Sequence, residues 1–321
     1  MSHPSNRSHQ STQPWPTSVS IIGAAGLVGS TVAAQLAFES RATDIYLQDR
    51  RVNLVEAHAI DINEARVVRS LHGPRLHVGP PPGEVDLVIV AASVQEDPAG
   101  DRREFIHSNI GVLADLTDTM KGQLGEKGLL LLLSNPVDIL ATWLWSEAGF
   151  DPRRIVGYSL NDSARFRMAV ARELNVEPHR VRGHVLGEHG RGQVPAFSSL
   201  TVDGKKADLS EEQIQRINLS IDTWFANWAA LKSGRSSGWT SGLGTSLFVE
   251  QLAQGLPTVG SAFSATTDTL PTAFLSLPIR FRDGAMHVQT LDVTPPEMEL
   301  LKASAASILR AVEDAHSTDS L

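Results

Sequence analysis

The chain contains no cysteine among its 321 residues. This absence excludes disulfides, iron–sulfur clusters, thiolate zinc sites and a cysteine nucleophile, and it is compatible with a cytoplasmic location. No hydrophobic run approaches the roughly 20 residues that would cross a bilayer. Lysine and arginine form no cluster and the formal net charge is −8. Nucleic-acid and membrane partners are therefore not expected, because both require clustered cations.

The remaining composition is that of a folded globular protein, with 41% hydrophobic and 20% charged residues. A length of 321 residues exceeds what one core usually holds. We therefore expect two domains, over residues 18–155 and 156–321. Residues 1–17 are polar and lack a basic start followed by an apolar core, so we predict a disordered tail and no secretory signal.

Short apolar segments alternate with helical patterns in the first of these domains. Strands are predicted at 19–22, 44–49, 86–90 and 128–133, and helices at 31–38, 52–68 and 105–120. Near-continuous apolar strands separated by helices are typical of a parallel sheet that is covered on both faces. The first domain is therefore predicted to be a Rossmann doubly wound α/β fold.

The second domain mixes strands and helices in a less regular order. Helices are predicted at 162–174, 210–232 and 295–315, with another after the Ser/Gly segment 233–244, and strands at 181–186, 198–202, 273–281 and 286–291. This mixture indicates an α+β domain.

Three glycines separate the first predicted strand from the first helix. Gly23, Gly26 and Gly29 have the spacing G-x-x-G-x-x-G, and glycines placed here let the backbone approach a pyrophosphate at a helix N-terminus. A plain tight turn would use the same glycines. Asp49 ends the second strand about 20 residues later, where a carboxylate can bind a ribose 2′-hydroxyl and repel a 2′-phosphate. The pattern favours NAD, although the two arginines that follow Asp49 leave NADP open.

His189 stands between glycines in the segment Gly187-Glu188-His189-Gly190. Imidazole donates and accepts protons near neutral pH, and the flanking glycines leave room for a substrate. A surface or core histidine is the alternative, since the chain has 11. The spacing of His184, Glu188 and His189 matches no common zinc pattern, so no metal site is predicted.

Asp162 and Arg165 lie three residues apart at the start of a predicted helix and therefore project from one face. Separately they could be a helix cap and a surface charge. Together they could orient a histidine and hold a carboxylate through two hydrogen bonds. Asn135 follows the fourth strand, at the edge where open α/β sheets place ligand contacts. A turn at Asn135-Pro136 is the alternative.

Together and in this order, these motifs resemble the lactate and malate dehydrogenase family. The resemblance runs from Val19 to about Ala311 and rests on Gly23 to Gly29, Asp49, Ser134-Asn135-Pro136-Val137-Asp138, Asp162-Ser163-Ala164-Arg165-Phe166 and Gly187-Glu188-His189-Gly190. It implies a dinucleotide-binding domain over 18–155, a substrate and catalytic domain over 156–321, NAD as the cofactor, and a homodimer or homotetramer.

The resemblance also implies a role for each site residue. His189 is the acid/base, and Asp162 orients it and stabilises the imidazolium. Arg165 binds the substrate carboxylate, Arg102 polarises the carbonyl, and Thr240 closes the pocket. The implied cofactor contacts are Gly23, Gly26, Leu27, Val28, Gly29, Asp49, Ala91, Ala92 and Asn135, of which Asn135 also contacts the reacting oxygen.

Three residues depart from the family's pattern. Near the tip of one loop, family members carry Arg for malate or Gln for lactate, whereas this chain has Glu96. A carboxylate there would repel the distal carboxylate of oxaloacetate. Ser93 replaces a usual glycine near the cofactor, and Arg191 replaces a usual acid. Glu96 could face the substrate, pair with Arg191 or point to solvent.

We therefore predict an NAD-dependent oxidoreductase that interconverts a 2-oxo acid and an L-2-hydroxy acid and is not specific for malate. Two alternatives are a malate dehydrogenase with Glu96 turned to solvent, and a catalytically silent or regulatory NAD-binding protein. An NAD-dependent glycosidase of similar fold uses a metal held partly by cysteine, which this chain lacks.

Overall fold

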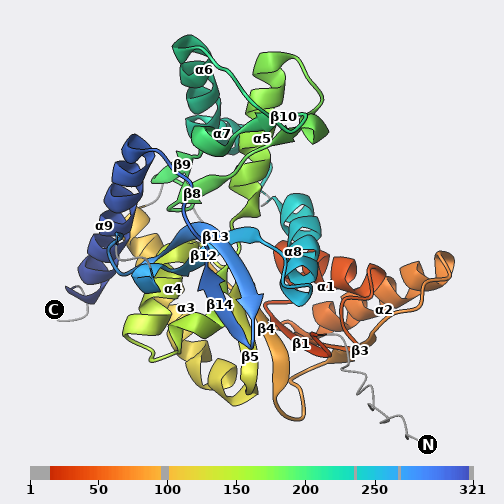
Figure 1. Cartoon of the computed structure of the whole chain (residues 1–321). Coiled ribbons are helices and arrows are strands. Elements are labelled where there is room, and N and C mark those ends of the chain that lie inside the picture. The colour runs from red at the N-terminus through yellow and green to blue at the C-terminus, as the bar shows by residue number, and fades with distance from the viewer. Residues whose placement is uncertain (1–14, 95–100, 235–236, 267–268, 318–321) are drawn as a thin grey trace, which may run out of the picture.

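The computed structural model describes residues 15–94, 101–234, 237–266 and 269–317 (Figure 1). The first half contains β1 (Ser18–Ile22), α1 (Leu27–Phe38), β2 (Asp44–Gln48), α2 (Val52–Val68), β3 (Arg75–Val78), β4 (Val85–Val90), α3 (Arg102–Gln123), β5 (Leu124–Leu132), α4 (Val137–Ser146) and β6 (Ile155–Gly157). These six strands are parallel, in the order β3-β2-β1-β4-β5-β6. This is the order of a Rossmann doubly wound sheet, as predicted from the sequence.

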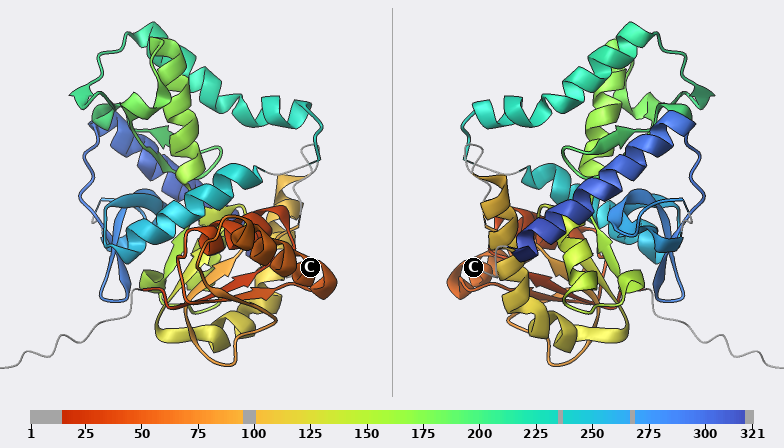
Figure 2. Two further views of the ribbon diagram at one scale, coloured as in Figure 1. Left: turned by 90° about the vertical axis from the view of Figure 1, so that its right-hand side faces the viewer. Right: turned by 90° about the vertical axis from the view of Figure 1, so that its left-hand side faces the viewer.

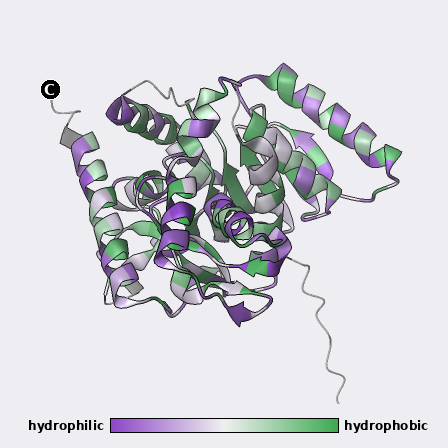
Figure 3. Cartoon of the chain, turned by 90° about the horizontal axis from the view of Figure 1, so that it is seen from above, coloured by the Kyte–Doolittle hydropathy of each residue, from purple (hydrophilic) through white to green (hydrophobic). Residues whose placement is uncertain are grey.

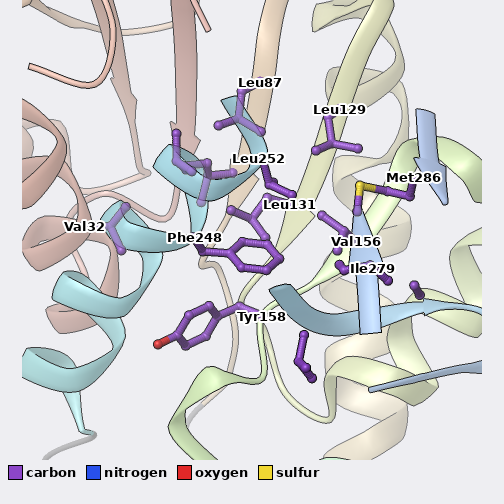
Figure 4. Close-up of a cluster of buried hydrophobic side chains, with 14 of the residues drawn as sticks. Val32, Leu87, Leu129, Leu131, Val156, Tyr158, Phe248, Leu252, Ile279 and Met286 are labelled. Atoms are coloured by element: carbon purple, nitrogen blue, oxygen red, sulfur yellow. The ribbon is translucent and has the colours of Figure 1, made fainter. Parts of the chain in front are cut away.

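The central strands are apolar on both faces because helices cover both sides. In β4, Leu87 and Ile89 belong to one buried cluster, whereas Val88 and Val90 belong to another. Alternate residues of a strand point to opposite faces, so the two clusters are the two sides of the sheet. Figure 4 shows the first side, where Phe248 packs near β-strand side chains such as Leu131.

The second half adds antiparallel strands to the same sheet. β6 pairs with β12 (Thr258–Phe263), and beyond it lie β13 (Phe274–Arg282) with β14 (Ala285–Val288), β8 (Val185–Gly187) and β9 (Gln193–Pro195). The sheet therefore runs without a break from β3 to β9. The domain boundary that we predicted between residues 155 and 156 falls inside β6.

The remaining elements form a smaller lobe and two long helices. The lobe contains α5 (Leu160–Leu174), η2 (Pro178–Arg180), β7 (Val181–Arg182), η3 (Phe197–Ser199), β10 (Thr201–Val202), β11 (Lys205–Lys206), α6 (Glu211–Asp222) and α7 (Trp224–Ala230). Outside it lie η1 (Pro152–Arg154), α8 (Gly238–Ala253), η4 (Ser264–Thr266) and α9 (Pro295–Ser317). Figure 2 shows this lobe standing at one end of the molecule, away from the parallel strands.

Three helices differ from the prediction, and one of them, α4, was not predicted at all. The predicted helix 210–232 is broken at Thr223, whose hydroxyl donates to the Leu219 carbonyl at 2.7 Å. α8 begins at Gly238, inside a segment that we predicted to precede the helix. The glycines of α8 are required by close packing, because a Cβ at Gly242 would lie 2.9 Å from Thr31. Packing against neighbouring elements therefore stabilises the helix through these glycines.

Several strands also differ from the prediction. β3, β6, β9, β11 and β12 were not predicted. The expected strand 181–186 is split into β7 and β8, which lie in different sheets, and the expected strand 198–202 is reduced to β10 after the helical turn η3. Each of the missed strands is short, polar or glycine-containing, so it lacks the apolar pattern that identifies a buried strand.

Residues 15–17 are ordered, contrary to the predicted tail. The rings of Trp15 and Phe281 have centroids 4.6 Å apart. The Thr17 N–H donates to Asp86 at 2.7 Å, and the Thr17 carbonyl accepts from the Thr43 N–H at 2.8 Å. The folded chain therefore includes Trp15, while residues 1–14 lie outside the described residues.

The hydropathy of the residues matches a buried sheet that is covered by outer helices. In Figure 3 the outer helices alternate between hydrophilic and hydrophobic turns. Among the described residues, no helix combines the length and the apolar character needed to span a membrane.

Candidate active site

The glycine turn between β1 and α1 keeps the start of α1 open. Gly23 has a φ of +92°, and a side chain there would collide with the backbone of Ala92. A Cβ at Gly29 would collide with the Gly23 carbonyl. Gly26 caps α1 without a side-chain hydrogen bond, and a Cβ on it would meet only the Gly23 oxygen, at 3.4 Å. The first N–H groups of α1, beginning at Leu27, thus remain available to an anion.

Asp49 follows β2 and braces this turn. Its carboxylate accepts from the Ala25 N–H at 3.2 Å and from the Arg51 N–H at 3.0 Å, and the Arg51 Nε lies 3.3 Å away. Burial raises the pKa of Asp49, but these hydrogen bonds outweigh it and hold the pKa below its ordinary value. Asp49 is therefore ionised, and its bracing role was not predicted. Arg50 is exposed.

The ends of β4 and β5 lie at the same edge as the glycine turn. The Ala91 N–H donates to the Ile22 carbonyl at 2.8 Å, and the Ser134 hydroxyl donates to the Ala92 carbonyl at 2.6 Å. Asn135 comes next and is exposed. The structure thus brings these predicted cofactor contacts together at the carboxyl edge of the parallel strands.

His189 and Asp162 are in direct contact, as predicted. His189 lies in the turn between β8 and β9, and its Nδ1 hydrogen-bonds the Oδ2 of Asp162 in the first turn of α5. Burial lowers the pKa of His189, but the charge and hydrogen bond of Asp162 raise it above the ordinary value. Since Nδ1 is engaged by Asp162, Nε2 is the nitrogen that remains for proton transfer.

Asp138 also holds the His189 loop, a role that we did not predict. Its Oδ2 accepts from the His189 N–H at 2.5 Å, and the side chain is buried. Burial raises the pKa of Asp138 to about 7. The Asp138 charge also helps to raise the pKa of His189. A second carboxylate therefore acts on the histidine from its backbone side.

Arg165 shares Asp162 with the histidine. Its Nη1 donates to the Oδ1 of Asp162 at 2.9 Å, and its Cζ lies 3.5 Å from the centroid of the Trp224 ring. Burial lowers the pKa of Arg165, and Asp162 opposes that shift. The side chain keeps 22% of its surface exposed. The guanidinium therefore still has donors that a carboxylate can reach.

Arg102, the first residue of α3, reaches the residue next to the histidine. Its Nη2 donates to the Oε1 of Glu188 at 2.7 Å. The Glu188 side chain is 4% exposed, and burial raises its pKa against the influence of Arg102. Arg102 is 35% exposed. The structure thus pairs Arg102 with the carboxylate of the residue that precedes His189, a partner that we did not predict.

Thr240 lies on α8 and is exposed. Its carbonyl oxygen lies 3.3 Å from the Tyr158 hydroxyl, which donates to the Asn161 Oδ1 at 2.9 Å. Asn161 in turn donates to the Ser241 hydroxyl at 3.0 Å. This buried network ties the start of α8 to the start of α5, so Thr240 is held near the helix that carries Asp162.

Glu96 lies outside the described residues. Of the other two departures from the family's pattern, Ser93 is exposed after β4, and Arg191 is exposed in the turn after His189. Within the described ranges, no three His, Asp or Glu side chains are grouped to hold a metal ion.

The site can therefore donate a proton, hold a carboxylate and accept an anion at the start of α1. Comparison with known proteins agrees with this chemistry. Residues 17–157 match the NAD-binding domain of lactate/malate dehydrogenases, and residues 160–318 match the α/β C-terminal domain of the same enzymes.

Individual relatives are distant but similar over most of their length. L-lactate dehydrogenase A of Hordeum vulgare is 29% identical over 91% of this chain and 85% of its own. Malate dehydrogenase of Chlorobium phaeobacteroides is 25% identical over 90% of this chain and 96% of its own. The solved structure of malate dehydrogenase from Picrophilus torridus has a TM-score of 0.82 at 26% identity, covering 94% of this chain and 98% of that one.

Proposed function

Since the chain belongs to the lactate/malate dehydrogenase family, we propose that it interconverts a 2-oxo acid and an L-2-hydroxy acid by hydride transfer. It is an NAD-dependent 2-hydroxy acid dehydrogenase. The observation that carries the proposed chemistry is the joint contact of His189 and Arg165 with the two oxygens of Asp162. One carboxylate thus places a proton donor beside a group that binds carboxylates.

His189 holds the proton that the reaction moves. In reduction, its protonated Nε2 donates to the carbonyl oxygen of the 2-oxo acid, and in oxidation the neutral ring takes the hydroxyl proton. Asp162 fixes the ring through Nδ1 and stabilises the imidazolium by its charge. Because the pKa of His189 is raised, the ring is protonated over more of the neutral range than a free histidine.

The arginines hold the substrate in this proposal. Arg165 binds the carboxylate with two parallel hydrogen bonds. Arg102 polarises the carbonyl and stabilises the negative charge that develops on its oxygen, which requires its guanidinium to exchange Glu188 for the substrate. Asn135 contacts the reacting oxygen, and Thr240 closes the pocket.

The residues around α1 fit NAD. The pyrophosphate would lie at the open N-terminus of α1 over Gly26, Leu27 and Val28, with the adenosine ribose toward Asp49. NADH, when bound, supplies the hydride, and the protein aligns it with the substrate. Ala91 and Ala92 would line the cofactor between its adenosine end and its nicotinamide end.

Asp49 should make the enzyme prefer NADH. An ionised carboxylate repels the 2′-phosphate of NADPH, and the neighbouring Arg51 is already paired with it. We expect kcat/KM to be at least about tenfold higher with NADH, and Asp49→Asn to narrow this gap while keeping an acceptor for the Ala25 N–H. Steady-state kinetics with both cofactors measure this. An equal or higher kcat/KM with NADPH would show that Arg50 or Arg51 dominates.

Asp138→Asn should shift the pH dependence of reduction. Reduction needs protonated His189, so kcat/KM falls as pH rises through its pKa. Asp138 ionises with a pKa of about 7, and once ionised its charge raises the pKa of His189. The amide removes that charge but keeps an oxygen for the His189 N–H. The fall should therefore move to lower pH, measured between about pH 5 and pH 9. An unchanged profile would show that the charge of Asp138 does not reach the ring.

Substrate choice is proposed from Glu96. A carboxylate at the specificity position disfavours oxaloacetate, so we propose that the enzyme is not malate-specific. NADH oxidation across 2-oxo acids with anionic, neutral and cationic side chains tests both this and the reaction itself. NADH binding without turnover on any of these acids would favour a silent or regulatory protein. A cytoplasmic location remains a prediction from the sequence.

We also propose that the chain forms a homodimer or homotetramer. Leu243 and Leu247 lie four residues apart on one face of α8, and 57% and 46% of their surfaces are exposed. Exposed apolar side chains on one helix face are typical of a protein interface. Sedimentation should find an oligomer, and Leu243→Glu should weaken it. A monomer at micromolar concentration would contradict this proposal.

A further inference from the structure

The guanidinium of Arg165 lies against an aromatic ring that none of the roles above explains. Its Cζ is 3.5 Å from the centroid of the Trp224 ring. One turn later, the Trp228 ring stacks on Trp224, with centroids 5.3 Å apart and 17° between the planes. A cation this close to an indole face is attracted by the ring's quadrupole, and a planar guanidinium stacks on it.

The break at Thr223 places Trp224 at the start of α7. Before the break, α6 is fixed to α5, because Ile217 and Ile221 share a buried cluster with Phe166. Phe166 is the neighbour of Arg165 in α5. The same pair of helices therefore fixes both the guanidinium and the beginning of the helix that carries the ring.

This contact limits the directions in which the Arg165 guanidinium can donate hydrogen bonds. Indole covers a face of the guanidinium, and Asp162 takes Nη1. The donors that remain lie in the guanidinium plane, which is the plane in which a carboxylate accepts two parallel hydrogen bonds. Without the ring, the long arginine side chain would regain rotamers that leave this plane, and substrate binding would have to remove that freedom.

We propose that Trp224 is a positioning residue for substrate binding, because its ring holds the Arg165 guanidinium in the orientation that receives the substrate carboxylate. The inference rests on the proposed function, in which Arg165 binds that carboxylate. Trp224 acts through Arg165 and takes no part in proton transfer, so it should affect the KM for the 2-oxo acid more than kcat.

Three variants test this by steady-state kinetics with the 2-oxo acid that the unmodified enzyme reduces best. Trp224→Leu removes the ring, Trp224→Phe keeps a smaller aromatic face, and Phe225→Leu removes the adjacent aromatic, which is 47% exposed. Trp224→Leu should raise the KM for the acid about tenfold, with the KM for NADH unchanged. Trp224→Phe should recover part of the loss, and Phe225→Leu should behave as the unmodified enzyme.

A double-mutant cycle tests the contact apart from catalysis. Arg165→Met and Trp224→Leu should each lower the Tm, and the double variant should lower it by less than the sum. Additive changes in Tm, or an unchanged KM for the acid in Trp224→Leu, would overturn the inference. No turnover by the unmodified protein on any 2-oxo acid would instead refute the proposed function, whatever the cycle shows.

Discussion

His189→Ala should lower kcat by about 10³-fold or more while NADH still binds, because general acid–base catalysis contributes about 10²–10⁴-fold and the ring acts on the substrate alone. The structure supports this separation. His189 lies in the turn between β8 and β9, whereas the glycine turn lies between β1 and α1. Stopped-flow measurement of turnover and titration of NADH fluorescence give the two quantities. The exposed histidine of β14, His287, offers a matched control as His287→Ala.

Asp162→Asn separates the catalytic role of Asp162 from a helix cap. The amide can keep the contact with Nδ1 but cannot stabilise the imidazolium, so kcat should fall strongly with little change in the free energy of unfolding. A mild kinetic effect of Asp162→Asn would reduce Asp162 to a capping residue.

The contrary outcome for His189→Ala is an equal loss of NADH binding and turnover. That result would make His189 a structural residue.

Glu96 should make oxaloacetate a poor substrate by a similarly large factor. Two like charges ~4 Å apart at an effective dielectric of ~20 repel by about 4 kcal/mol, and replacing an attracting arginine could double this. Discounted by half for screening, about 4 kcal/mol corresponds to roughly a thousandfold in kcat/KM. An acid with a cationic or hydrogen-bond-donating side chain should therefore outperform oxaloacetate, and Glu96→Arg should move the preference toward oxaloacetate.

A second variant distinguishes the possible partners of Glu96. If Glu96 pairs with Arg191, Glu96→Arg should lose activity on all acids, and the double swap Glu96→Arg with Arg191→Asp should restore it. Comparing kcat/KM for the single and double variants across the same acids decides between these outcomes. Efficient reduction of oxaloacetate by the unmodified protein would contradict both versions and favour a solvent-facing Glu96.

The Rossmann fold of the first half was predictable because its central strands, such as β4 and β5, contain nearly continuous apolar runs. The strands that were missed obey other constraints. β3 is an edge strand with exposed residues such as Arg75. β12 contains Gly260, where a Cβ would lie 2.9 Å from Phe248 of α8. A glycine that makes room for a helix far away in the sequence leaves no pattern in its own segment.

The site was predictable where its residues lie in compact motifs. The spacing of Asp162 and Arg165 on one helix, and the glycines around His189, indicated the three residues that the structure brings together. Asp138 and Trp224 were missed because tertiary folding alone brings them to the site. Asp138, for example, lies 51 residues before His189 in the sequence, yet it accepts a hydrogen bond from the His189 N–H.

Because one sheet joins the two halves, we expect the chain to unfold as one cooperative unit. β6 pairs with β5 on one side and, through Gly157 and Ser261, with β12 on the other, so separating the halves would leave backbone groups at this junction unpaired. Unfolding of either half therefore removes strands with which the other half forms backbone hydrogen bonds. A destabilising substitution in the cofactor half should lower the stability of the substrate half as well, so the two should not titrate separately in denaturant.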